Sequence, residues 1–129
     1  MSKLLDPNKI KIGDVILVAG NIKAVVNIQK KLGYGDSSKW THVAGSIGGY
    51  DLVEGRMPKS GICNLQKDYV DKGIEIKVMR KTFVKDYDRI KVALWWATMN
   101  NVPYDYLQLL RFPIDANELL FLRNLFNSK

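Results

Sequence analysis

The chain has 129 residues, a length that predicts one domain with a single hydrophobic core. Hydrophobic residues make up 47% of the chain and charged residues 26%, which is typical of a globular protein and excludes disordered, collagen-like and coiled-coil chains. The formal net charge of +7 permits contact with polyanions or anionic lipid headgroups but does not demonstrate it.

The first half of the chain predicts a strand, a helix and a β-hairpin. A β-branched run bounded by glycines is typical of a buried strand, and the helix is predicted because apolar residues recur at helical spacing after the capping residue Asn21. Gly48-Gly49 is a turn signal between two strand-like segments. A polar loop is expected over 33–39. The elements predicted are, in order, Val15–Ala19, Ile22–Leu32, Trp40–Ile47 and Tyr50–Glu54.

The second half predicts further strands and then helices. Asp86 or Asp88 can cap the first of these helices, and its core-facing residues are expected to be Ile90, Ala93, Leu94 and Ala97. The predicted elements are a strand over Ile62–Leu65, a helical turn over Gln66–Lys72, a strand over Ile74–Met79, and helices over Arg89–Asn100, Tyr104–Leu110 and Glu118–Phe126. Strands clustered between helices predict an α+β fold, a small antiparallel sheet packed against helices, in a single domain 1–129.

The counts of reactive side chains limit the chemistry. One cysteine excludes an intramolecular disulfide and a cysteine-rich zinc site, and one histidine excludes a multi-histidine metal centre. The glycine pairs are not followed by the Gly-Lys-Ser/Thr of a phosphate-binding loop. We therefore expect no cofactor and no metal, and any catalysis must use His42, Cys63, carboxylates or a group from outside the chain.

His42 and Glu54 lie on the two arms of the predicted hairpin. A turn with an odd number of residues places them opposite each other, whereas a two-residue turn pairs Glu54 with Val43 and puts His42 on the other face. The first geometry gives an imidazole held by a carboxylate, as a general base beside a nucleophile requires. The simpler interpretation is a packing histidine and a solvated glutamate at a strand end.

Four segments, in order, resemble the circularly permuted branch of the NlpC-type papain-like cysteine hydrolases. This branch includes the YiiX- and YycO-like bacterial and phage proteins and relatives of lecithin–retinol acyltransferase. The segments are Lys11-Ile-Gly-Asp-Val-Ile-Leu-Val, Trp40-Thr-His-Val-Ala-Gly-Ser-Ile-Gly-Gly, Leu52-Val-Glu-Gly and Val102-Pro-Tyr-Asp105. The resemblance covers nearly all of the family core. It implies a permuted papain-like fold with His42 as general base and Glu54 as the residue that orients it.

The nucleophile is the main departure from that family. The family cysteine follows the Pro-Tyr-Asp segment, whereas this chain has no cysteine after Asp105. Three interpretations stay open: the chain lacks the C-terminal nucleophile segment of a longer protein, it is an inactive relative that uses the groove for binding, or Cys63 serves instead. The last is the least favoured, because a single cysteine on a short strand is usually a buried apolar residue.

The function expected is a cysteine hydrolase, a peptidase, amidase or acyl hydrolase, acting on a peptide, a peptidoglycan fragment or a lipid acyl group. The alternative is an inactive relative that binds a peptide or lipid. A basic cluster around Arg80, Lys81 and Arg89 makes nucleic-acid binding a third, lowest-ranked hypothesis. No membrane span or signal peptide is evident, which predicts a cytoplasmic location, and contact with a membrane surface or release by lysis or specialised secretion stays open.

Overall fold

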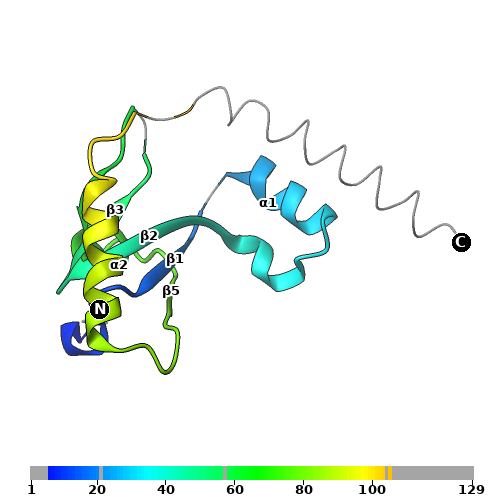
Figure 1. Ribbon diagram of the computed structural model, residues 1–129. Coiled ribbons are helices and arrows are strands. Elements are labelled where there is room, and N and C mark those ends of the chain that lie inside the picture. The colour runs from blue at the N-terminus through cyan, green and yellow to red at the C-terminus, as the bar shows by residue number, and fades with distance from the viewer. Residues whose placement is uncertain (1–5, 21, 57, 104, 106–129) are drawn as a thin grey trace, which may run out of the picture. The chain divides into compact units, whose positions relative to one another are not determined.

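The computed structural model describes residues 6–20, 22–56, 58–103 and 105 (Figure 1). It divides into two compact units: Met1–Gly20 with His42–Tyr104, and Asn21–Thr41 with Asp105–Lys129. The helices predicted over Tyr104–Leu110 and Glu118–Phe126 lie, apart from Asp105, outside the described residues.

The first unit is built on a five-stranded antiparallel sheet in the order β4-β3-β2-β1-β5. Its strands are β1 (Val15–Ala19), β2 (Trp40–Gly48, from His42 onward in this unit), β3 (Asp51–Glu54), β4 (Gly61–Asn64) and β5 (Ile76–Met79). The 3-10 turn η1 (Pro7–Lys9), the π-helical turn η3 (Gln66–Val70) and helix α2 (Asp86–Thr98) complete it. The structure therefore has the α+β class predicted from the sequence.

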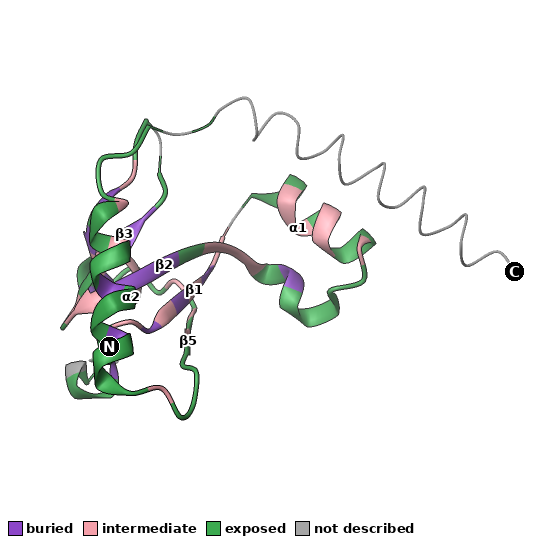
Figure 2. Ribbon diagram, in the orientation of Figure 1, coloured by how far each residue is buried: buried purple, intermediate pink, exposed green. Residues whose placement is uncertain are grey.

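One face of this sheet carries the hydrophobic core. Paired residues of neighbouring strands share a face, and the pairs Leu52↔Cys63 and Ile16↔Val78 all point into the same apolar cluster. Figure 2 shows buried residues concentrated on the strands. The cluster comprises Ile10, Ile16, Val18, Ala44, Leu52, Cys63 and Leu65, with Tyr50, Tyr69, Ile74, Ile76 and Val78 packed against it.

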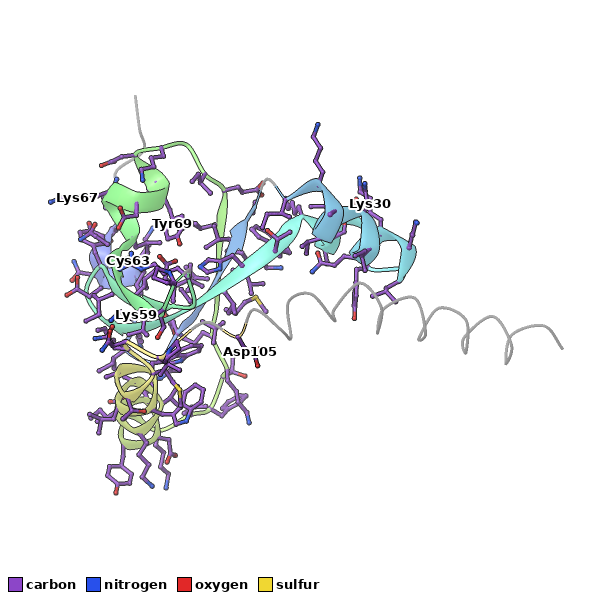
Figure 3. The ribbon with its side chains drawn as sticks, turned by 90° about the horizontal axis from the view of Figure 1, so that it is seen from above. Lys30, Lys59, Cys63, Lys67, Tyr69 and Asp105 are labelled. Atoms are coloured by element: carbon purple, nitrogen blue, oxygen red, sulfur yellow. The ribbon has the colours of Figure 1, made fainter. Side chains whose placement is uncertain are left out.

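Helix α2 covers the opposite face, but with different residues from those predicted. Ala93 is buried as expected, whereas Ile90 and Leu94 are 46% and 62% exposed and Ala97 is exposed as well. The inward positions are instead Arg89, which reaches Asp14, and Trp96, whose indole occupies the space that a side chain at Gly45 would need. In Figure 3, η3 and α2 lie on opposite sides of the sheet. The helix is not capped by Asp86 or Asp88. Both carboxylates lie in its first turn, where their negative charge interacts favourably with the helix dipole.

A buried carboxylate ties three segments of the first unit together. Asp14 is 1% exposed and accepts hydrogen bonds from the backbone N–H of Lys11, from Arg80 Nε and Nη2 at 2.8 and 2.6 Å, and from Arg89 Nη1 at 3.4 Å. Burial alone would raise the pKa of Asp14, but these hydrogen bonds and the two guanidinium charges outweigh it and lower the pKa. The carboxylate is therefore ionised and paired.

The second unit contains helix α1 (Lys23–Lys31) and the 3-10 helix η2 (Gly35–Lys39), which replaces the loop predicted over 33–39. Gln29 Nε2 donates to the carbonyl oxygen of Trp40 at 3.3 Å, and the Lys39 ammonium lies 4.8 Å from the centre of the Trp40 ring. The N-cap of α1 is Ile22, which makes no side-chain capping hydrogen bond, and not the predicted Asn21, which lies outside the described residues. No helix in the described part of the chain is long and apolar enough to cross a membrane.

Candidate functional site

The hairpin β2–β3 brings His42 and Glu54 together, through a register that neither predicted turn gives. Glu54 pairs with Ala44, so His42 is its diagonal neighbour on the same face. The distance from His42 Nε2 to Glu54 Oε2 is 2.7 Å. The predicted direct opposition of the two residues is wrong, and so is the pairing of Glu54 with Val43.

A β-bulge accounts for this register. Asp51 pairs with Gly48 across a two-residue turn, and Leu52 pairs with Ser46, so Ile47 is an extra residue on β2. Without it, the pairing set by the turn would place Glu54 opposite Gly45, on the face away from His42. Gly48 and Gly49 permit the turn because both have positive φ, of 136° and 56°. The bulge is therefore what puts imidazole and carboxylate on one face.

Glu54 is a buried carboxylate with two donors. It is 7% exposed, and its Oε2 accepts hydrogen bonds from His42 Nε2 and from the hydroxyl of Tyr69. Burial acts to raise the pKa of Glu54, yet the hydrogen bonds from His42 and Tyr69 and the charge of His42 outweigh it, so the pKa lies below its ordinary value. Because an ionised carboxylate only accepts, His42 Nε2 must be the donor and carry a hydrogen.

Tyr69 is the site residue that the sequence analysis missed. It comes from η3 (Figure 3). Its ring centre lies 6.4 Å from that of His42, and its hydroxyl donates to Glu54. Burial, and then the hydrogen bond to Glu54, raise the pKa of Tyr69, so the phenol keeps its proton. One sequence pattern could have indicated its position. Tyr69 follows Leu65 by four residues, and on a helical turn this spacing places both side chains on the same face.

His42 is oriented but accessible. Its side chain is 30% exposed, against 8% for that of Glu54. Since Nε2 is engaged with Glu54, the remaining nitrogen is Nδ1, for which no hydrogen-bond partner is found among the described residues. An imidazole with one nitrogen fixed by a carboxylate and the other open can accept a proton at a defined position.

Cys63 lies close to the same carboxylate in an environment that opposes thiolate formation. The residue is buried on β4 and packs in the core cluster. Burial and the neighbouring charge of Glu54 raise the pKa of the Cys63 thiol to about 12. At neutral pH the thiol is therefore protonated, and the surroundings disfavour Cys63 as a nucleophile.

The remaining predicted features divide between structure and surface. Arg80 and Arg89, two cations of the predicted basic cluster, are bound to Asp14. Trp96 packs on Gly45 whereas Trp95 is 53% exposed, so the adjacent tryptophans face different environments, as helical spacing requires. Within the described ranges, no group of three or more His, Cys, Asp or Glu residues could hold a metal ion.

No family model, no curated protein and no solved structure matches this chain. The resemblance to permuted papain-like hydrolases therefore stays a prediction made on the sequence motifs.

Proposed function

We propose that this chain carries the His42–Glu54 proton-accepting pair of a cysteine hydrolase-type domain that cleaves amide or ester bonds. The observation that carries the proposal is the 2.7 Å hydrogen bond between an accessible imidazole and a buried carboxylate that Tyr69 also holds. A surface histidine would need neither the buried partner nor the second donor. The substrate class expected is a peptide, a peptidoglycan fragment or a lipid acyl group.

In the proposed mechanism His42 takes up a proton at Nδ1. A thiol transfers its proton to Nδ1, and the thiolate attacks the carbonyl carbon of the substrate to form a tetrahedral oxyanion. The imidazolium, stabilised by Glu54, then returns the proton to the leaving amine or alcohol as the C–N or C–O bond breaks. Water, deprotonated by His42, hydrolyses the thioester and regenerates the thiol. Because Cys63 is the one cysteine of the sequence and its pKa is raised to about 12, the reacting thiol in this mechanism comes from outside these 129 residues.

The test begins with the reading frame beyond the codon for Lys129. A Cys-Ser-Glu-like stretch there is expected, and the protein expressed from the whole frame should hydrolyse p-nitrophenyl butyrate or acyl-peptide anilides. His42→Ala should lower kcat by about 10²–10⁴-fold, the usual contribution of a positioned general base. Lys30→Gln, which removes an exposed charge on α1, is the control. Hydrolysis that is unchanged in His42→Ala would contradict the proposal.

A binding role is the second candidate, and the environment of Cys63 is the observation that favours it. With its single thiol held protonated, the chain contains no activated thiolate of its own. A stop codon directly after Lys129, together with saturable binding of a muramyl peptide or a short-chain phospholipid in calorimetry, would select this role over hydrolysis.

A further inference from the structure

A cleft of about 680 Å³ opens where β3 leads into β4 and where α2 ends. The described residues that line it belong to the first unit. They are Arg56, Pro58, Lys59, Ser60, Gly61, Ile62, Asn100 and Asn101. The volume is that of a small-molecule site, and the described residues of the lining combine two cations, two amides and a hydroxyl, with no acidic side chain among them.

The two walls of this cleft are joined by backbone and side-chain hydrogen bonds at Ser60. The Ser60 N–H donates to the Val102 carbonyl at 2.9 Å, and the Ser60 carbonyl accepts from the Asn101 N–H at 3.0 Å. The Ser60 hydroxyl accepts from the Val102 N–H at 2.8 Å and donates to the Met99 carbonyl. Asn101 has φ of 66°, a left-handed conformation that asparagine tolerates better than most residues. The walls are thus set before any ligand arrives.

The two cations of the cleft have no carboxylate partner among the described residues. Arg56 and Lys59 are both exposed, and Lys59 lies on the segment that leads into β4 (Figure 3). Arg80 and Arg89, by contrast, are both paired with Asp14. A guanidinium and an ammonium beside amide and hydroxyl groups favour the binding of an oxyanion. A guanidinium can bind such a group through two parallel hydrogen bonds.

Gly61 connects the cleft to the His42–Glu54 pair. It pairs directly with Glu54 across β3 and β4, so the two Cα atoms are separated by only about 5 Å. The Arg56 guanidinium lies over Gly61: a Cβ atom added there would come within 2.7 Å of Arg56 Cζ. The absence of a side chain at Gly61 is therefore what lets the guanidinium lie beside the strand end that carries Glu54.

We propose that this cleft binds the anionic group, a carboxylate or phosphate, of the substrate. Arg56 is the principal ligand and Lys59 assists it. Anion binding stands on the cleft alone, whereas the assignment of that anion to a substrate cleaved at His42 rests on the proposed function. The substrate class then narrows to acyl compounds with a negative charge close to the bond that is cleaved.

The test measures binding of three probes by the backbone ¹H–¹⁵N signals of Ser60, Gly61 and Asn101. Inorganic phosphate and N-acetylalanine represent the two anion sources, and N-acetylalanine amide is the neutral match. We expect saturable shifts with at least one anion and none with the amide. Arg56→Gln should weaken binding by about 10-fold or more, because it removes the positive charge and the charge-assisted hydrogen bonds of the guanidinium to the anion.

Two further variants separate the local site from general charge. Gly61→Ala keeps the net charge but displaces the guanidinium, and should also weaken binding. Lys30→Gln removes an exposed charge on α1, in the second unit, and should leave binding unchanged. Equal shifts with the neutral amide, or equal weakening by Lys30→Gln and Arg56→Gln, would overturn the proposal. His42→Ala should retain anion binding, so a protein that binds anions without hydrolysing esters would sink the proposed function and leave the anion site standing.

Discussion

Removing the Tyr69 hydroxyl tests whether Glu54 is the buried, ionised anchor of the site. Tyr69→Phe keeps the aromatic ring against the core and removes one of the two donors to Glu54 Oε2. The carboxylate is only 7% exposed, so water cannot fully replace the lost donor. A hydrogen bond to a charged group contributes about 1.5–3 kcal/mol, and we expect the free energy of unfolding at pH 7 to fall by that amount.

The sign of the pH dependence makes this prediction sharper. The folded pKa of Glu54 lies below its ordinary value of 4.5, so its ionised form contributes stability above that pH and loses it as the pH falls through the folded pKa. Tyr69→Phe removes one of the interactions that lower this pKa. The difference between the two proteins should therefore be largest near pH 7 and should shrink as the pH falls through the folded pKa of Glu54, where the carboxyl takes up a proton and the bond becomes a neutral one, worth about 0.5–1.5 kcal/mol.

Urea unfolding followed by tryptophan fluorescence, at several pH values between 7 and 3.5, measures both quantities. Tyr87→Phe is the matched control, because Tyr87 is 67% exposed and keeps its ring beside Lys91; its effect should stay within about 0.5 kcal/mol. A loss below about 0.5 kcal/mol for Tyr69→Phe at pH 7, or a loss independent of pH, would refute the role given to Tyr69.

Three further predictions concern the same unit. Long-range ¹H–¹⁵N spectra of neutral His42 should show the hydrogen on Nε2, as an ionised Glu54 requires, and an Nδ1–H tautomer would contradict the orientation described. Asp14→Ala should lower the free energy of unfolding in urea by about 3–5 kcal/mol, because it leaves Arg89 largely buried without its partner. A loss below about 1 kcal/mol would contradict a stabilising role of the Asp14 ion pairs. Cys63, with its pKa raised to about 12, should react with iodoacetamide at pH 7 on the order of 100-fold more slowly in the folded protein than in urea, and comparable rates would show that the thiol is not suppressed.

The sequence was sufficient to predict the strands and to single out His42 and Glu54. The run Val15–Ala19 forms β1 with the predicted bounds, because a continuous apolar run between glycines, rich in β-branched residues, is typical of a buried strand. The hairpin arms were also predictable. The register of the hairpin was not predictable, because the bulge at Ile47 depends on how β2 and β3 pair. A change of one residue in that register puts His42 on the opposite face of the sheet.

Long-range packing accounts for the other differences. The inward face of α2 is set by Arg89, whose partner Asp14 lies 75 residues earlier in the chain, and apolar periodicity carries no information about such a pair. Tyr69 was missed for a similar reason: its hydroxyl acquires a role through Glu54, 15 residues away on another element. Both errors concern polar contacts between elements, which local sequence patterns do not encode.

The carboxylate of Glu54 has different effects on the two reactive side chains beside it. It holds His42 through the hydrogen bond to Nε2, whereas its charge, after burial, raises the pKa of the Cys63 thiol. A thiol that His42 is to activate must therefore lie away from Glu54. The imidazole ring itself defines that position. Nε2 faces the carboxylate, so the second ring nitrogen, Nδ1, points in a different direction. Within the proposed function, a nucleophile must consequently approach His42 from the Nδ1 side, so its thiolate is paired with the imidazolium and kept apart from the carboxylate whose charge, together with burial, raises the pKa of Cys63.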